Sequence, residues 1–183
     1  MEKNKRLKEK LKYLIKRQAF FKQKVKLSSG KISNYYFDLR RITLNPEGSY
    51  LVAELIFDFI KRNKFSSIGG PTIGADPIVS SVVILSYIKG FPIKGFLVRK
   101  TAKDHGLMRQ IEGPNLTKKD KILLVDDVAT SGSSLLETAF VLRKKGLKIN
   151  SVMVILDRQE EAEENLKKAK IKLYSLFKAD DFR

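Results

Sequence analysis

Two adjacent carboxylates, Asp126 and Asp127, follow four apolar residues, Ile122 to Val125, that are typical of a buried strand. A turn of small residues, Ala129 to Ser134, comes next and leads into an amphipathic helix expected to begin near Leu135. Such a junction presents unpaired backbone N–H groups and the positive end of a helix, which together suit a phosphate monoester. The carboxylates suit sugar hydroxyls or Mg²⁺. Asp-Asp alone is equally typical of a capped helix start, but the Thr-Ser-Gly-Ser that follows favours a phosphate site.

A second glycine-rich turn, Gly69 to Gly74, precedes a helix expected from Asp76 to about Ile88, and Thr72 is its candidate contact residue. No Gly-Lys-Ser/Thr follows at P-loop spacing and no G-x-G-x-x-G is present, so neither of those nucleotide-binding motifs is supported. Two phosphate-type turns in one sheet fit a substrate that carries two separate phosphate groups.

The segment from Arg99 to Gly106 gathers four basic or protonatable side chains: Arg99, Lys100, Lys103 and His105. A solvated loop has the same composition. However, this loop holds the single histidine of the chain and is bounded by glycines, which favours a hinged lid. Chemistry that expels pyrophosphate needs cations to neutralise the leaving group, and a closing loop supplies them while excluding water.

Residues 27–40 cluster three aromatic side chains beside a polar turn and predict a hairpin. Such aromatics usually pack in a core, but Tyr36 and Phe37 are neighbours on a strand and cannot both point inward, so one of them is available to stack on a flat heterocycle. Arg158 follows an apolar strand. It is able to pair with Glu160 or Glu161, or to grip a substrate carboxylate through a bidentate contact.

Strands alternate with helices along the chain, which indicates right-handed crossovers and a mainly parallel sheet with helices on both faces. Ligands bind beyond the carboxyl ends of the strands in such sheets. Four of the segments described above each follow an expected strand, so we expect them to form a single site. They are Gly69–Gly74, Arg99–Gly113, Asp126–Ser134 and Asp157–Arg158. The expected strands cover residues 65–69, 93–98, 122–125, 149–156 and 171–176, and the expected helices cover residues 46–62, 76–88, 135–145 and 160–169, after a first amphipathic helix.

Composition bounds the possible functions. A chain of 183 residues predicts one domain, in which residues 1–45 form a helix and a hairpin. The absence of cysteine and the single histidine exclude a disulfide framework, a thiolate nucleophile and a multi-histidine metal site. No apolar stretch reaches membrane-spanning length and the start is lysine-rich, so we expect a cytoplasmic protein. Of the net charge of +17, residues 1–26 carry eleven Lys/Arg against two Glu, which indicates the solvated face of a helix more than a nucleic-acid site.

The acidic strand end and its turn resemble the PRPP motif of type I phosphoribosyltransferases. The hairpin and the Arg99–Gly106 loop make the likeness closer to the orotate phosphoribosyltransferase family, over nearly the whole chain. The resemblance implies a mainly parallel α/β sheet with a small N-terminal hood, and transfer of the phosphoribosyl group of PRPP to orotate with Mg²⁺ bound through the diphosphate. It also implies the following roles: Asp126 and Asp127 hold the ribose hydroxyls; Ala129, Thr130, Ser131, Gly132 and Ser133 cradle the 5′-phosphate; Arg99, Lys100, Lys103 and His105 serve the pyrophosphate; Arg158 meets the orotate carboxylate; and Tyr36 and Phe37 flank its ring.

Two positions depart from some family members, because Ser28 and Gly74 stand where those members carry lysine. The resemblance further implies a homodimer in which the Arg99–Gly113 loop reaches the neighbouring site. Two alternatives stay open from the residues. One is a phosphoribosyltransferase for a purine or another pyrimidine, and the other is a non-catalytic PRPP- or nucleotide-sensing regulator with RNA affinity. The expected partners are PRPP and orotate, with no membrane, and nucleic acid is not favoured.

Overall fold

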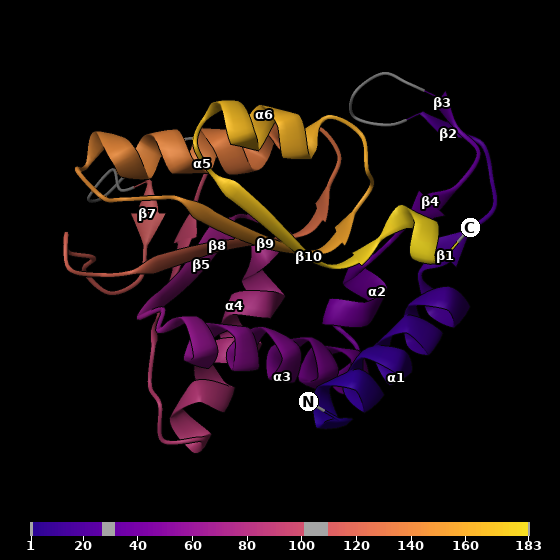
Figure 1. Cartoon of the computed structure of the whole chain (residues 1–183), viewed down its shortest axis with the longest axis horizontal. Helices are drawn as coiled ribbons and strands as arrows, with labels where there is room; N and C mark the ends of the chain where they lie inside the picture. The colour runs from indigo at the N-terminus through magenta and orange to yellow at the C-terminus, as the bar shows by residue number, and fades with distance from the viewer. Residues whose placement is uncertain (1, 27–31, 101–109, 183) are drawn as a thin grey trace.

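A six-stranded sheet runs through the centre of the computed structural model, which describes residues 2–26, 32–100 and 110–182 (Figure 1). Its strands lie in the order β10-β9-β8-β5-β6-β7, and all neighbours pair in parallel except β6 and β7. The bounds are β5 Ser67–Pro71, β6 Lys94–Val98, β7 Ile111–Glu112, β8 Ile122–Ala129, β9 Ser151–Asp157 and β10 Lys172–Lys178. This is the mainly parallel α/β sheet that the alternating pattern predicts.

Helices cover both faces of the sheet, α3 (Pro46–Asn63) and α4 (Ala75–Ile88) on one and α5 (Ser133–Lys144) and α6 (Ala162–Lys168) on the other (Figure 1). The central strand shows why. In β8, Leu123 and Val125 join the core under α3 and α4, while Ile122 and Leu124 join the core under α5 and α6. A strand buried on both faces reads as a continuous apolar run. Within the described ranges, no helix has the length and apolar character needed to cross a membrane.

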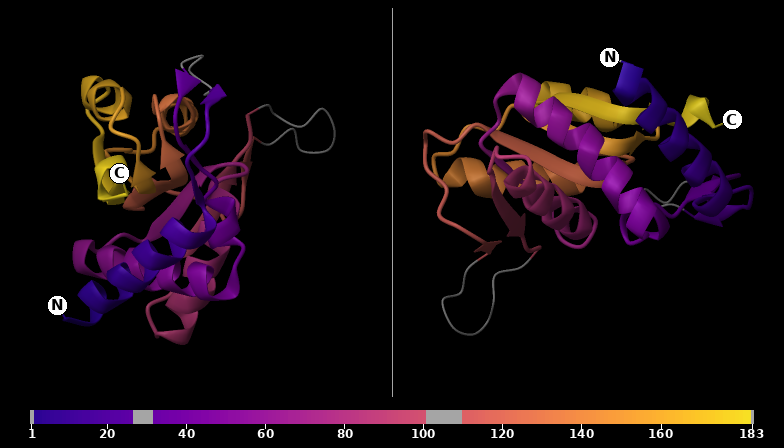
Figure 2. Two further views of the ribbon diagram at one scale, coloured as in Figure 1. Left: turned by 90° about the vertical axis from the view of Figure 1, so that its right-hand side faces the viewer. Right: turned by 90° about the horizontal axis from the view of Figure 1, so that it is seen from below.

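The N-terminal region forms a layer of its own beside this sheet. Helix α1 (Glu2–Gln18) buries Leu11, Leu14 and Ile15 and packs against α3, as Figure 2 shows from below. Its other face carries the lysines. Lys3 of α1 and Lys89 at the end of α4 both pair with the buried Glu54 of α3, at 3.2 and 2.7 Å. The basic helix is therefore docked onto the domain.

The expected hairpin is built from two strand pairs. β1 (Phe20–Phe21) pairs with β4 (Tyr36–Phe37), and β2 (Val25–Lys26) pairs with β3 (Ile32–Ser33), both antiparallel. Its expected turn, which includes Ser28, lies outside the described residues. Phe37 packs edge-on against Phe182 beyond a short 3-10 helix (η1, Ala179–Asp181), so the C-terminal end of the chain holds the base of the hairpin.

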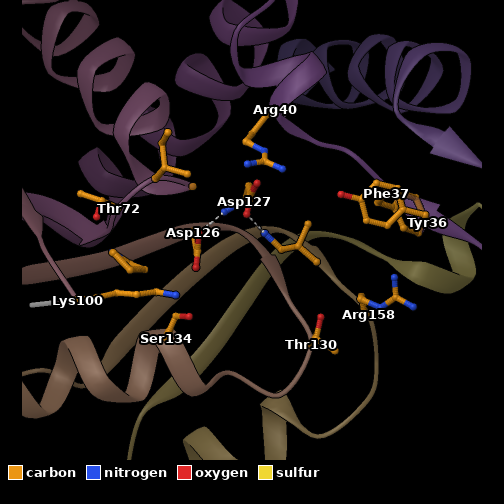
Figure 3. Close-up of a pocket in the computed structure, with 14 residues that line it drawn as sticks. Tyr36, Phe37, Arg40, Thr72, Lys100, Asp126, Asp127, Thr130, Ser134 and Arg158 are labelled. Carbon is orange, nitrogen blue, oxygen red and sulfur yellow. Dashed lines mark hydrogen bonds between the residues drawn. The ribbon is translucent and has the colours of Figure 1, made fainter. Parts of the chain in front are cut away.

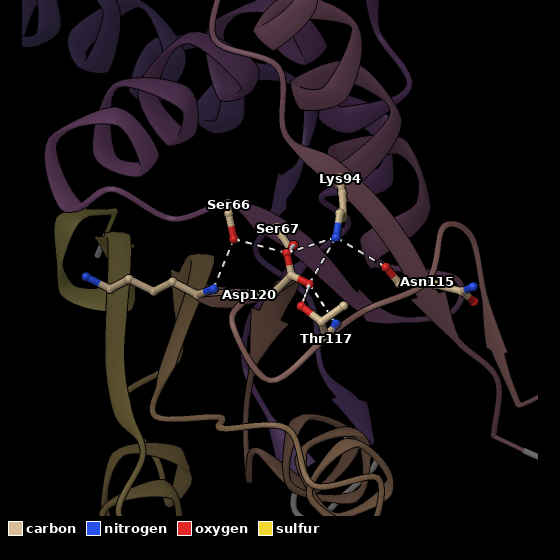
Figure 4. A network of polar contacts seen from close by, with 7 residues as sticks. Ser66, Ser67, Lys94, Asn115, Thr117 and Asp120 are labelled. Atoms are coloured by element: carbon tan, nitrogen blue, oxygen red, sulfur yellow. Dashed lines mark hydrogen bonds and ion pairs between the residues drawn. The ribbon is translucent and has the colours of Figure 1, made fainter.

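Asp120 organises a polar network at the amino ends of β5, β6 and β8 (Figure 4). Its carboxylate accepts hydrogen bonds from the Lys94 ammonium at 3.0 Å, the Thr117 N–H at 2.7 Å and the hydroxyls of Ser66 and Ser67. Burial alone would raise the pKa of Asp120, but the bonds from Thr117 and Lys94 outweigh it and lower the pKa to about 2. The network joins the starts of three strands.

The structure corrects several expected boundaries. β8 does not stop before the carboxylates but continues through Asp126 and Asp127 to Ala129, because β9 stays paired with it as far as Asp157. β5 begins at Ser67 and takes in Gly70 and Pro71, which were expected in the turn. The Arg99–Gly113 segment, which was expected to be a loop throughout, contains β7, an edge strand of two residues. The four-residue helix α2 (Arg40–Thr43) was not predicted.

Candidate active site

A cavity of about 430 Å³ lies beyond the carboxyl ends of β5, β8 and β9, with the hairpin and α2 on its other side (Figure 3). It brings together three of the four segments that the sequence singles out, and Lys100 from the base of the fourth. The lining residues are Tyr36, Phe37, Arg40, Pro71, Thr72, Ile73, Gly74, Lys100, Asp126, Asp127, Val128, Thr130, Ser134 and Arg158. The expectation of a single site at this edge of the sheet agrees with this geometry.

The acidic pair forms the floor of the cavity. Asp126 accepts the N–H of Asp127 at 2.9 Å, and Asp127 accepts the N–H of Val128 at 2.7 Å (Figure 3). Both side chains keep some contact with solvent through the cavity, yet protein surrounds them on most sides. The pKa of Asp126 is raised well above its usual value, mainly by desolvation and next by the negative charge of Asp127. Desolvation also raises the pKa of Asp127, against the opposing effects of the Val128 N–H and Arg40.

Asp76, in the first turn of α4, adds a third carboxyl group near this floor. Its Oδ1 is buried and has no hydrogen-bond partner among the described residues, and desolvation raises the pKa of this side chain. The charge of Asp76 contributes to the raised pKa of Asp126. Three carboxyl groups therefore lie at or near the floor, and a ligand that donates hydrogen bonds would satisfy them.

The turn between β8 and α5 has the geometry of an anion cradle. Gly132 adopts φ +76°, a conformation that favours glycine, and the following residues open the twelve-residue helix α5. Ser131 and Ser133 contact each other through their hydroxyls at 3.1 Å, and Asn165 of α6 fixes the Ser131 carbonyl at 3.0 Å. A hollow of about 80 Å³ lies inside the turn. Ala129 is buried at the end of β8, directly before this turn.

The second turn, Thr72 to Gly74, passes close to the acidic pair. A Cβ added at Gly74 would lie 2.2 Å from Oδ1 of Asp126 and 2.8 Å from Oδ1 of Asp127, so only glycine leaves room for both carboxylates. Gly70 is equally tight, because its Cβ would lie 2.0 Å from the Val125 carbonyl oxygen. Gly74 stands where some family members carry lysine, and in this structure a side chain there would need the two carboxylates to shift.

Arg158 is only 3% exposed and spans the gap between β9 and the hairpin. Its Nε donates to Glu160 at 2.9 Å, a terminal N–H donates to the Ser33 hydroxyl at 3.1 Å, and its guanidinium lies over the Tyr35 ring at 4.8 Å. The pairing with Glu160 that the sequence left open is therefore present, and the side chain still lines the cavity. The contact of Tyr35 with Arg158 was not predicted, because three consecutive aromatic residues do not indicate which ring packs against an arginine.

The remaining candidates fall into three groups. Lys100 lines the cavity, whereas Arg99 lies 3.7 Å from Glu112 of β7 and borders a smaller neighbouring hollow. Phe37 is buried in the aromatic core although it touches the cavity, and Tyr36 is the more open of the two. Lys103 and His105 lie outside the described residues. Arg40 lines the cavity and was missed, because an arginine after a hairpin carries no motif signal.

Within the residues that the structure describes, no three ligating side chains gather in a way that would hold a metal ion. The carboxylates that line the cavity beside the phosphate-type turns are Asp126 and Asp127. A magnesium ion bound mainly by the phosphates of a substrate, with few or no protein ligands, fits this donor set.

The parallel sheet, the acidic pair and the phosphate-type turns at one strand edge define a type I phosphoribosyltransferase. The model of the phosphoribosyl transferase domain family matches residues 45–178. The chain is 42% identical to the orotate phosphoribosyltransferase of Aquifex aeolicus over 176 residues, which cover 94% of this chain and 96% of the relative. It is 40% identical to that of Streptomyces coelicolor, with 83% of each chain covered. The chain thus belongs to the orotate phosphoribosyltransferase family.

Solved structures agree with this assignment. The orotate phosphoribosyltransferase of Mycobacterium tuberculosis in complex with PRPP superposes with a TM-score of 0.78 at 30% identity, covering 96% of this chain and 98% of the other. The adenine phosphoribosyltransferase of Trypanosoma brucei gives a TM-score of 0.68 at 14% identity, with 97% of this chain and 81% of that chain covered, and shares the fold alone.

Proposed function

We propose that this protein transfers the phosphoribosyl group of PRPP to orotate, giving orotidine 5′-monophosphate and pyrophosphate in pyrimidine biosynthesis. One observation carries the proposal: the acidic pair, two phosphate-type turns and the buried Arg158 share a single cavity. Such a cavity suits a substrate with a sugar between two phosphate groups beside a base that bears a carboxylate.

The acidic pair would receive the ribose. Asp126 and Asp127 accept its hydroxyls, and the Thr130–Ser133 turn receives the 5′-phosphate through backbone N–H groups at the start of α5. These contacts fix the sugar while positive charge develops at its anomeric carbon and the bond to pyrophosphate breaks. The chain therefore needs a positioned substrate nitrogen more than a strong base.

The leaving group would be met from the other side of the cavity. Thr72 and its turn contact the diphosphate, and Lys100, Arg99, Lys103 and His105 supply positive charge as pyrophosphate departs. Mg²⁺, when bound to the diphosphate, neutralises part of the same charge.

The base would bind between the sheet and the hairpin. Residues 1–45 act as a hood on a single domain, with Tyr36 and Phe37 flanking the ring. Arg158 meets the carboxylate, and its planar guanidinium has donors beyond those that reach Glu160 and Ser33. A neutral base offers this arginine no charged partner, which supports orotate over a purine.

A panel of bases tests the proposal. Purified protein is given PRPP and Mg²⁺ with orotate, uracil, adenine or hypoxanthine, and the nucleotide product is followed. We expect orotidine 5′-monophosphate to dominate. A preference for another base would make the chain a different phosphoribosyltransferase, and salt-dependent RNA binding without any turnover would make it a regulator.

We also propose a homodimer with a shared site. Exposed apolar side chains at Ile73, Ile84, Tyr87 and Ile88 fall on one face of α4 and the turn before it, and Ile73 lines the cavity. A second copy packed there would stand beside the cavity, and a two-fold axis gives both copies the same reach.

Mixing two inactive variants tests the shared site. Lys103→Ala and Asp126→Asn homodimers should each be nearly inactive, whereas about half the dimers in a random mixture are hybrids with one intact site. Co-refolding should therefore restore about a quarter of wild-type activity. Activity at the parental level, with exchange confirmed by a tag, would mean that Lys103 acts in its own subunit.

A further inference from the structure

Arg40 opens α2 directly behind the hairpin, and its guanidinium faces the acidic pair across the cavity (Figure 3). In the described part of the chain its only ionic partner is Asp38, at 3.8 Å, and half of its side chain is exposed. Arg158 differs, because it is buried and held by Glu160 and Ser33. Arg40 is thus a second cavity arginine, besides Arg158, with N–H donors available to a ligand.

Asp127 lies opposite this guanidinium without an ion pair between the two groups in the described residues. The positive charge of Arg40 nevertheless acts on Asp127, since it is one of the influences that oppose the raised pKa of that carboxyl. Oδ1 of Asp127 accepts a hydrogen bond from the Val128 N–H, and the carboxylate has further lone pairs that can accept hydrogen bonds from a ligand. The other charged groups around Asp127 are Asp126 beside it on β8, Asp76 on α4, and Lys100 and Arg158 across the cavity.

A hydroxyl group fits between these two side chains, because it donates one hydrogen bond and accepts others. It would donate to Asp127 and accept from Arg40, so both charged groups would be satisfied by one ligand atom. A phosphate oxygen would be repelled by Asp127, and an ammonium group would be repelled by Arg40.

We propose that Arg40 is a specificity-determining residue that donates a hydrogen bond to a ribose hydroxyl held by Asp127. The inference rests on the proposed function and deepens it, since it makes the enzyme select ribose over deoxyribose through a cation as well as through the acidic pair. Losing a charge-assisted hydrogen bond of this kind should weaken binding about tenfold or more.

The test removes the two partners separately. Inhibition constants against PRPP are measured for orotidine 5′-monophosphate and for its 2′-deoxy and 3′-deoxy forms, with wild type and with Arg40→Gln. The variant should bind orotidine 5′-monophosphate about tenfold or more weakly, yet bind one of the deoxy forms as well as wild type does. Arg40→Lys keeps N–H donors and should recover part of the loss.

Arg41→Gln is the matched control, because Arg41 lies on the same helix but packs over the Phe21 ring at 4.8 Å and pairs with Asp38. It should bind all three ligands as wild type does. An Arg40→Gln loss that is equal for all three ligands, or no larger than that of Arg41→Gln, would overturn the inference. Wild-type turnover of orotate and PRPP is measured first, so a failure of the proposed function would be seen independently.

Discussion

Replacing Asp120 by asparagine removes one negative charge from the network that joins the starts of β5, β6 and β8, while it leaves a side chain of nearly the same shape. The side chain is 8% exposed and its pKa is about 2, against an ordinary value of 3.8. A difference of about 1.8 units, at about 1.36 kcal/mol per unit, corresponds to about 2.5 kcal/mol of folding free energy at neutral pH.

The sign follows from proton binding. Because the pKa of Asp120 is lower in the folded protein, the unfolded chain binds more protons between about pH 4 and pH 2, and the stabilisation is lost as the pH falls through that range. The difference between wild type and Asp120→Asn should therefore be about 2.5 kcal/mol at pH 7 and about half of that at pH 3.

Urea unfolding at both pH values measures this difference. Glu164→Gln is the control, because Glu164 pairs with Lys168 at 2.7 Å on an exposed helix surface, where solvent screens the pair and its contribution to stability is small. A destabilisation of Asp120→Asn that is the same at pH 7 and pH 3 would show that shape and neutral hydrogen bonds matter, and that the charge does not.

Three further predictions concern the cavity. Asp126→Asn and Asp127→Asn should each lower turnover by roughly 10²-fold. Wild-type turnover in both variants would remove the pair from the mechanism. The midpoint temperature of thermal unfolding of Asp126→Asn at neutral pH should rise, because desolvation raises the pKa of that carboxyl and its buried charge therefore destabilises the fold. Arg158→Ala should weaken the binding of orotate by about 1.5–3 kcal/mol, and that of PRPP far less, as measured by steady-state kinetics. Equal losses for the two substrates would indicate a structural role of Arg158 through Ser33 and Glu160. Gly74→Ala should weaken PRPP binding in calorimetric titration because its Cβ would meet Asp126 at 2.2 Å, and an unchanged affinity would contradict the close packing of this turn.

The architecture was predictable because its signals are local and repeated. The apolar run Ile122–Val125 reads as a strand buried on both faces, and Pro46 marks a helix start that Asn45 caps at 3.0 Å from the Gly48 N–H. Strand ends of a parallel sheet converge, so Asp126, Arg158 and the glycine turn could be placed near one another before any distance was known.

Other features depend on partners that are distant in sequence. The continuation of β8 past Asp126 is set by its pairing with β9, and β7 exists because Ile111 pairs with Val98. Neither segment is long enough to show a hydrophobic period that would predict a strand. The stacking of Arg158 over Tyr35 and the position of Arg40 opposite Asp127 likewise arise from the packing of the hairpin against the sheet, which no local pattern encodes.

The central strand β8 has carboxylates with opposite proton linkage near its two ends. Asp120, just before the strand, has a lowered pKa, whereas Asp126 and Asp127 near its end have raised pKa values. Mild acidification neutralises the charge buried at the end of β8 that lines the cavity, and only stronger acid removes the stabilisation by Asp120 at the other end. These three groups therefore favour the folded state more in moderate acid than at neutral pH, and a ligand that donates hydrogen bonds to the ionised acidic pair would reduce that difference.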